Sequence, residues 1–390
     1  MISGGFRMFR RLGDRCRGCG NCRELKCSEN CTGCRACLLV CPEDAILPGD
    51  PDLKKYTVKV NGREVRAGGT VGDALEGAGL KRSMIPDDGD IFSPCGSGAC
   101  LACSVSIDGC IAPSCVTPLS EGMVIETAPE PPLRFVSSFG PHTAGGVGTP
   151  FSEKTGTPVE VVCFTHGCNL RCPQCQNSQV AFTSLGNLLD PNETAGILLG
   201  LESIYRTGTV TISGGECTLN RTWLSSTIRA IRELKGDVNV HVDTNGTILT
   251  PEYLDELVDS GMNLIGIDLK GLRTETFMEI SGLHDEKTAR VYLENSWNAF
   301  RYLSENHPDI FLGLGVPYSR SIISSDEITA MASRISSIDR DVQVTILDYR
   351  PEFRSRDIEW PDEDEMLRVK DLMIDEGLRN VVVQTSSGFR

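Results

Sequence analysis

The chain has 390 residues, 40 % of them hydrophobic, and a formal net charge of −15. This length allows about two or three domains with a sizeable core, which excludes a disordered chain. No apolar run reaches the roughly 18 residues of a membrane span, and the polar, Arg-rich start is unlike a secretory leader, so we expect a cytoplasmic protein without membrane partners. The negative charge argues against nucleic acid as a partner, because its binders carry a basic face.

Many of the 18 cysteines are separated by only two to four residues. Disulfide-rich chains are usually short and secreted, whereas close neighbours favour ligation of clusters or metal ions. Exposed iron-sulfur sites are prone to oxidation, so the cysteine content indicates a reducing, anaerobic compartment.

Residues 1–50 contain two consecutive runs of four cysteines, and Pro42 follows the last cysteine. Thiolates two residues apart can reach different irons of one cubane, and a final Cys-Pro is typical of bacterial ferredoxins. The segment resembles a two-cluster 4Fe-4S ferredoxin, although Ser28 stands where the first run would carry proline. The alternative is zinc, whose knuckles also use Cys-x2-Cys. The resemblance implies one ligand set of Cys16, Cys19, Cys22 and Cys41 and a second of Cys31, Cys34, Cys37 and Cys27.

Residues 51–128 are expected to form a separate β-grasp domain. An alternating run, 56–60, leads into Asn61-Gly62, a strong hairpin signal, and a helical pattern covers 71–80. Four cysteines follow with a spacing that resembles 2Fe-2S ferredoxins, and the next residues resemble the N-terminal 2Fe-2S domains of hydrogenases and respiratory-complex subunits. The implied ligands are Cys95, Cys100, Cys103 and Cys115.

Two glycines of this loop, Gly96 and Gly98, allow it to wrap closely around a cluster. Cys110 follows an Asp-Gly turn and is not expected to be a ligand. The alternative interpretation is a β-grasp domain whose cysteines are incidental.

Residues 129–158 are rich in proline and glycine and are expected to be a linker or capping loop. Residues 159–390 alternate short apolar runs with longer amphipathic ones, which predicts βα units around a parallel sheet, that is, an α/β partial (β/α)6 barrel. In such a fold the residues after each strand form the site. We expect strands near 159–164, 210–213, 238–243, 264–268, 311–316 and 342–347.

The first of these strands is followed by Cys168, Cys172 and Cys175, three thiolates on one short loop. Three ligands leave the fourth iron of a cubane open for a substrate. This spacing is the signature of the radical S-adenosylmethionine (SAM) superfamily, in which SAM binds the open iron. The second strand is followed by Gly214, Gly215 and Glu216, which resemble the family's Gly-Gly-Glu segment that holds the methionine amine.

The next two strands end in Asp243-Thr244-Asn245 and Asp268-Leu269-Lys270, which resemble glycyl-radical-enzyme activases of the pyruvate formate-lyase activating type. The resemblance implies that Asp243, Asn245 and Asp268 lie beside SAM, where the two carboxylates help form a cation site. It implies that Lys270 faces the methionine carboxylate. Taken singly, the two aspartates could be helix N-caps and the lysine a solvated charge.

The chain departs from the family at three places. Gln174 precedes the last cluster cysteine, where an aromatic residue is usual, and Cys217 follows Gly-Gly-Glu in place of a frequent proline. Asp348-Tyr349-Arg350 stands where an activase carries a histidine. Cys163 and Cys217 are expected to be buried thiols that act as small hydrophobic side chains.

The resemblance implies a radical SAM oxidoreductase with three 4Fe-4S clusters, one 2Fe-2S cluster and SAM as cofactors. It would abstract hydrogen from a protein or peptide, taking electrons from a low-potential donor through its ferredoxin-like segments. The first alternative is a radical SAM enzyme for a small molecule or tRNA nucleoside, and the second is an iron-sulfur electron-transfer module without catalysis.

Overall fold

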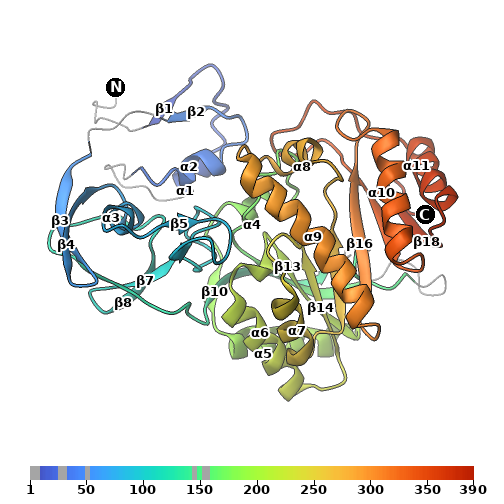
Figure 1. Ribbon diagram of the computed structural model, residues 1–390, viewed down its shortest axis with the longest axis horizontal. Helices are drawn as coiled ribbons and strands as arrows, with labels where there is room; N and C mark the ends of the chain where they lie inside the picture. The colour runs from blue at the N-terminus through green and yellow to red at the C-terminus, as the bar shows by residue number, and fades with distance from the viewer. Residues whose placement is uncertain (1–8, 25–32, 49–52, 143–146, 152–158) are drawn as a thin grey trace.

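A computed structural model describes residues 9–24, 33–48, 53–142, 147–151 and 159–390. Three parts follow one another along the chain, and the two smaller N-terminal ones lie on the same side of the large C-terminal body (Figure 1). Among the described residues, no helix combines the length and the apolar character needed to cross a bilayer.

The first part, the N-terminal segment, has short elements only. Strand β1 (Phe9–Arg11) pairs antiparallel with β2 (Ile46–Pro48), and the helices α1 (Asn21–Glu24) and α2 (Ala36–Leu39) lie between them in the chain. Ala45 and Val40 are buried.

The second part is a five-stranded sheet with one helix, as the β-grasp expectation requires. Asn61 and Gly62 both have positive φ, so they form the tight turn of the expected hairpin. Helix α3 (Val71–Gly77) begins with a capping box between Thr70 and Asp73. The sheet order is β4-β3-β9-β7-β8, and the strands are β3 (Lys55–Val60), β4 (Arg63–Gly68), β7 (Ser104–Ile107), β8 (Cys110–Pro113) and β9 (Val124–Thr127), with a separate pair β5 (Arg82–Ser83) and β6 (Ile91–Phe92).

The large body is built on a ten-stranded sheet with the order β12-β10-β11-β13-β14-β15-β16-β17-β18-β19. From β11 to β18 neighbouring strands are parallel, so the α/β fold class is confirmed, and the six expected strands correspond to β11 and β13 to β17. The parallel strands are β11 (Glu160–Thr165), β13 (Thr209–Gly214), β14 (Asn239–Thr244), β15 (Leu264–Asp268), β16 (Phe311–Tyr318), β17 (Gln343–Asp348) and β18 (Asn380–Thr385); β19 (Gly388–Phe389) pairs antiparallel with β18.

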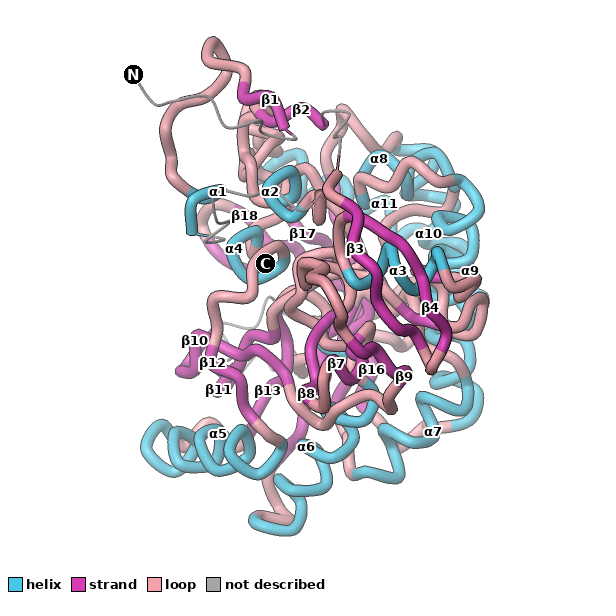
Figure 2. The backbone as a smooth tube through the Cα atoms, turned by 90° about the vertical axis from the view of Figure 1, so that its left-hand side faces the viewer, coloured by secondary structure: helices cyan, strands magenta, loops and turns pink. Residues whose placement is uncertain are grey.

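Helices cover the outer face of this sheet, and Figure 2 shows the five-stranded domain beside the barrel. Side-chain N-caps define where several of them begin; Asp190, Thr250 and Ser324 each accept a backbone N–H of the first turn. The helices are α4 (Ser178–Ala181), α5 (Pro191–Tyr205), α6 (Arg221–Leu234), α7 (Pro251–Ser260), α8 (Thr274–Ser281), α9 (Glu286–Asn306), α10 (Ser325–Ile338) and α11 (Glu363–Asp375), with a 3-10 turn η1 (Cys217–Leu219).

The described part of residues 129–158 contains a strand where a linker or capping loop is expected. Strand β10 (Arg134–His142) pairs antiparallel with β11 and with β12 (Asn187–Leu189), so the segment extends the sheet. A bulge between Ser137 and Gly140 shifts the register, and this irregularity breaks the alternation by which a strand is identified in a sequence. Further on, Gly148 lies against the backbone of β15 and β16 inside the barrel.

Candidate radical SAM site

A cavity of about 470 Å³ lies at the C-terminal ends of the parallel strands. This is the edge at which parallel α/β sheets hold their sites. The structure brings together all ten residues predicted for this site. The cavity is lined by Cys168, Cys172, Cys175, Gly214, Gly215, Glu216, Asp243, Asn245, Asp268 and Lys270.

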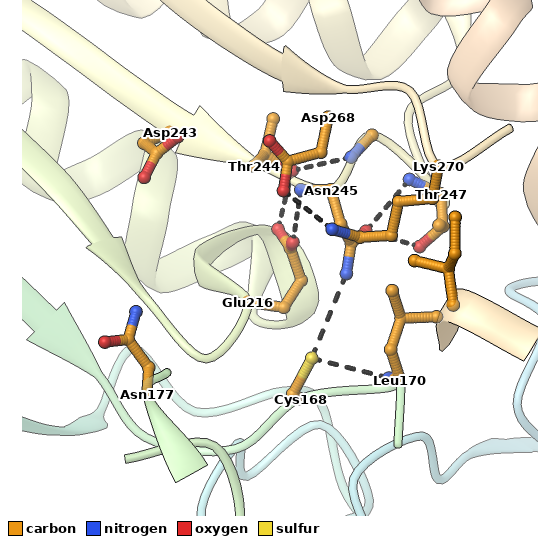
Figure 3. Close-up of polar contacts among 12 residues, drawn as sticks. Cys168, Leu170, Asn177, Glu216, Asp243, Thr244, Asn245, Thr247, Asp268 and Lys270 are labelled. Atoms are coloured by element: carbon orange, nitrogen blue, oxygen red, sulfur yellow. Dashed lines mark hydrogen bonds and ion pairs between the residues drawn. The ribbon is translucent and has the colours of Figure 1, made fainter. Parts of the chain in front are cut away.

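The three cysteines lie on the loop after β11. Cys168 is 8 % exposed, and its Sγ accepts hydrogen bonds from the Leu170 amide (3.4 Å) and from Asn245 Nδ2 (3.9 Å). Figure 3 shows the Cys168 thiol directed toward Asn245. Burial raises the pKa of Cys168 to about 12, so the thiol is protonated unless a metal displaces the proton. Three thiols and an adjoining cavity fit a cubane with one open iron.

The two glycines join the end of β13 to the cysteine loop. The Gly215 amide donates to Thr165 O (2.8 Å) and the Glu216 amide donates to Gly167 O (2.9 Å). A Cβ on Gly215 would lie 2.4 Å from Gly167 O, and one on Gly214, whose φ is +127°, would lie 2.3 Å from the Thr165 amide. Glycine is required at both positions because a side chain would separate this segment from the cysteine loop.

Glu216 is 1 % exposed, and its carboxylate is held by neighbouring groups. Oε1 accepts from the Thr218 amide (3.0 Å), Thr218 Oγ1 (2.6 Å) and Thr244 Oγ1 (2.7 Å), whereas Oε2 accepts only from the Asn245 amide (2.7 Å) among the hydrogen bonds of the described residues. The Glu216 carboxylate points toward Thr244 and Asn245 (Figure 3). These bonds fix the carboxylate at the cavity wall and leave Oε2 with acceptor capacity for an amine.

Asp243 and Asp268 lie at the C-terminal ends of the adjacent strands β14 and β15 and line the same cavity. Ser213 Oγ donates to Asp243 Oδ2 (2.6 Å), and Lys270 Nζ lies 2.8 Å from Asp268 Oδ2. Burial, and next the charge of Asp268, raise the pKa of Asp243 to about 6. Burial alone would lower the pKa of Lys270, but its interactions with Asp268 and with the Cys172 side chain raise this pKa. The nearby helices α7 and α8 have other N-caps, so the two aspartates are not capping residues.

An amide network behind Cys168 was missed by the sequence analysis. Asn245 Nδ2 donates to Asn169 Oδ1 (3.0 Å), Asn169 Nδ2 donates to Thr247 Oγ1 (2.7 Å), and Thr247 donates back to Asn245 Oδ1. All three side chains are buried. The only signal for Asn169 was its place directly after Cys168; the network orients the Asn245 amide toward the thiol.

Two of the departures noted in the sequence line the cavity. Gln174 donates from Nε2 to Arg350 O (2.8 Å), and the phenol of Tyr349 donates to Ile280 O (3.3 Å). Both side chains are therefore fixed, and both are buried. Cys163 and Cys217 are 0 % exposed, in agreement with a packing role.

The four cysteines of the second domain form a compact group. The Cys95 thiol lies close to those of Cys100 and Cys115, and the Cys103 thiol lies close to that of Cys115. All four are buried, and the Ser97 amide donates to Cys95 Sγ (3.4 Å). Cys110 is exposed in β8. Four converging buried thiols and an inward amide fit a 2Fe-2S cluster.

In the N-terminal segment the first predicted set surrounds one small hollow. It is lined by Cys16, Cys19, Cys22 and Cys41. Backbone amides donate to Cys16 Sγ and Cys41 Sγ, each at 3.3 Å. Of the second set, Cys34 and Cys37 are half-buried, while Cys27 and Cys31 lie outside the described residues. The first grouping fits the cross-paired set that the ferredoxin resemblance implies.

Comparison with known families agrees with this geometry. Residues 162–319 match the radical SAM superfamily, residues 54–130 a 2Fe-2S iron-sulfur cluster binding domain, and residues 28–47 a 4Fe-4S binding domain. The chain thus contains a radical SAM domain preceded by a 2Fe-2S and a 4Fe-4S binding domain. It is similar to a pyruvate formate-lyase-activating enzyme and to a putative glycyl-radical enzyme activating enzyme, and these likenesses support an enzyme of the oxidoreductase type.

Among curated relatives, the chain is 28 % identical over 147 residues to the pyruvate formate-lyase-activating enzyme of Streptococcus mutans, covering 35 % of this chain and 54 % of that enzyme. It is 30 % identical over 135 residues to Fe-coproporphyrin III synthase of Methanosarcina barkeri, covering 34 % and 33 %. It is 27 % identical over 134 residues to GTP 3',8-cyclase of Clostridium acetobutylicum, covering 34 % and 41 %. The matches span from a third to about half of these relatives.

Among solved structures, SuiB from Streptococcus suis bound to S-adenosylmethionine matches with a TM-score of 0.40 and 17 % identity, covering 56 % of this chain and 45 % of SuiB.

Proposed function

We propose that the chain is a radical SAM enzyme that cleaves SAM reductively and removes a hydrogen atom from a protein or peptide, with electrons supplied through its own iron-sulfur segments. One observation carries the proposal: the three cluster cysteines share one cavity with the Gly-Gly-Glu segment and the Asp243, Asp268 and Lys270 charges. A thiol loop alone would suit an electron carrier, whereas a carrier has no use for a charged cavity beside it.

A cubane held by Cys168, Cys172 and Cys175 would supply the single electron for reductive cleavage, and SAM would supply the hydrogen-abstracting chemistry. The chain's own residues bind and orient. In this proposal Glu216 Oε2 would accept the methionine ammonium and the Lys270 ammonium would attract the methionine carboxylate, since both side chains line the cavity. Asp243 and Asp268 supply two carboxylates that suit a cation or ribose hydroxyls.

A polypeptide substrate is proposed from the similarity to the pyruvate formate-lyase-activating enzyme and from the strand-end motifs shared with activases. The product would be a glycyl radical or another modified residue. The second candidate is a small-molecule substrate, which is favoured by similar matches to Fe-coproporphyrin III synthase and GTP 3',8-cyclase. The closely spaced cysteines suit a reducing compartment, so we place the enzyme in the cytoplasm.

The first experiment is SAM cleavage by the anaerobically reconstituted full chain with dithionite, measured as 5'-deoxyadenosine and methionine by mass spectrometry. We expect both products in equal amounts. Cys172→Ser should abolish them, and Cys110→Ser, an exposed thiol outside every set, should leave them unchanged. Absence of both products from the wild type would leave the electron-transfer module as the function.

The second experiment addresses the substrate. The reduced enzyme is incubated with SAM and, in parallel, with a purified glycyl-radical enzyme, with purified tRNA and with a porphyrin. A doublet EPR signal on the protein partner supports glycyl radical formation. Consumption of tRNA or porphyrin without such a signal would contradict the polypeptide substrate and support a nucleoside or small-molecule substrate instead.

A further inference from the structure

The loop that carries Cys95 and Cys100 lies directly against the loop that carries Cys168. A Cβ on Gly167, whose φ is +88°, would lie 3.1 Å from the Cys100 amide nitrogen and 3.3 Å from Cys95 Cβ. Cys95 and Cys100 are 1 % and 0 % exposed and belong to the same hydrophobic cluster as Cys168. No layer of solvent separates the two cysteine loops at this contact, which we call the seam.

The Arg171 side chain spans the seam. Arg171 lies between Cys168 and Cys172 in the chain, and its Nη1 donates to Cys168 O (2.7 Å) and Leu170 O (2.8 Å). Its Nη2 donates to Cys95 O (2.8 Å) and Pro94 O (3.1 Å). The planar guanidinium holds two backbones at a fixed separation, which a lysine ammonium cannot do in the same geometry.

The N-terminal segment meets the same corner from the other side. A Cβ on Gly96 would lie 3.7 Å from Leu39 Cδ1 and 3.7 Å from Arg171 Nη2. Arg354 fixes this arrangement, because its Nε donates to Cys41 O (3.0 Å) and its amide donates to Pro173 O (2.8 Å). The Cys95 corner therefore lies between the two other cysteine segments.

We propose that Arg171 is a positioning residue that clamps the 2Fe-2S loop to the radical SAM loop, and that electrons reach the radical SAM site across this seam. This inference rests on the proposed function. Each electron that crosses the seam oxidises the centre of the second domain by one electron and reduces the radical SAM centre by one electron. The first centre is held by Cys95, Cys100, Cys103 and Cys115, and the second by Cys168, Cys172 and Cys175. No bond breaks, and a low-potential one-electron protein donor of the ferredoxin class restores the first centre.

The test compares Arg171→Met with Arg232→Met in the reconstituted full chain. Arg232 is a matched control because its guanidinium also makes four bonds to loop acceptors, Gly261 O, Gly236 O, Val238 O and Asn263 Oδ1, and none of them belongs to a cysteine loop. The first readout is EPR of the dithionite-reduced protein, which reports magnetic coupling between the two centres. The second is SAM cleavage driven either by a reduced ferredoxin or by dithionite.

We expect Arg171→Met to lose the magnetic coupling and to lower ferredoxin-driven cleavage by roughly tenfold or more, because a small displacement of a positioned group has a large cost in rate. Dithionite, a small reductant, should still drive cleavage at the wild-type rate. Arg232→Met should match the wild type in both readouts. Coupling and ferredoxin-driven rates equal to the wild type in Arg171→Met would overturn the inference.

Two further outcomes are separated by design. If Arg171→Met loses iron, Arg171→Lys replaces it; partial coupling in this variant supports the clamp, and full coupling with a full ferredoxin-driven rate contradicts it. If the wild type shows magnetic coupling but no SAM cleavage with dithionite, the proposed function is contradicted, whereas the contact between the two centres is supported.

Discussion

Among single residues, Asp243 combines burial with a nearby like charge. Its carboxyl accepts from Ser213, faces Asp268 across the cavity and has a pKa of about 6, raised first by burial and then by Asp268. Because the pKa in the unfolded chain is about 3.8, the folded state binds the proton more tightly. Stability from this group is therefore complete below pH 3.8 and is lost as pH rises through about 6.

Asp243→Asn should remove the loss of stability that the wild type shows as pH rises through about 6. We expect the variant and the wild type to unfold at similar temperatures near pH 4, and the variant to be more stable above pH 6 by about 1–3 kcal/mol. Thermal unfolding of the SAM-free protein across pH 4–8 measures the difference. A difference that does not change with pH would show that the Asp243 pKa is ordinary in the folded chain.

The glycines of the Gly-Gly-Glu segment allow a second prediction at this scale. Gly215→Ala places a Cβ 2.4 Å from Gly167 O, so we expect a loss of about 1–3 kcal/mol and much weaker SAM binding. Gly200→Ala in helix α5 has open space around the Cβ and should instead gain about 0.5–1 kcal/mol. Unfolding and calorimetric titration with SAM measure both; equal SAM affinity in the two variants would contradict the assigned role.

Among the elements, the parallel strands explain why the cavity residues could be predicted. Each predicted group lies at the C-terminal end of a strand or shortly after it, and these ends of parallel strands share one edge, so short motifs far apart in the chain meet without further information. Strand β10 could not be predicted, because its bulge breaks the alternating pattern.

Contacts between distant loops could not be predicted either. Arg171 meets Cys95 across 76 residues, and the network of Asn169 and Thr247 spans 78, so neither appears in any local pattern. The fixed position of the Glu216 carboxylate also depends on Thr244, from the next strand. Motifs therefore indicated which side chains line the cavity, and the loop conformations decided how these side chains are held.

The segment 147–151, which includes Gly148 and lies inside the barrel, provides a prediction at the scale of elements. A Cβ on Gly313 in β16 would lie 2.3 Å from the Gly148 amide, and Gly266 in β15 faces the Val147 backbone in the same way. Gly313→Ala should displace this segment and lower stability by about 1–3 kcal/mol. Gly236→Ala, whose Cβ would have an ordinary 3.8 Å contact, is the control. Thermal unfolding should show a loss in the first variant only.

At the scale of the whole molecule, the second domain has its own hydrophobic core, but part of its cysteine loop packs into the core of the large body. Val58, Leu75, Val105 and Ile125 form a separate hydrophobic cluster, whereas Cys95 and Cys100 pack in the core of the large body. We therefore expect the domain to fold by itself, with one side of its cluster loop uncovered.

A fragment of residues 54–130 should therefore fold and show the visible absorption of a 2Fe-2S cluster, and the absorption should bleach in air faster than in the full chain. The control is a full chain in which Cys19, Cys34 and Cys172 are replaced by serine, so that the remaining absorption comes mainly from the same cluster. Equal bleaching rates in fragment and control would show that the large body gives this loop no protection.

The burial of Cys95 and Cys100 also determines how the protein can mature. A scaffold that delivers iron and sulfide has to touch the thiols, and in the closed molecule these two are 1 % and 0 % exposed. We therefore expect delivery by such a scaffold to the second domain to precede its docking on the barrel. Chains that dock early would accumulate as a folded but metal-deficient population, which overexpression without added assembly factors should enrich.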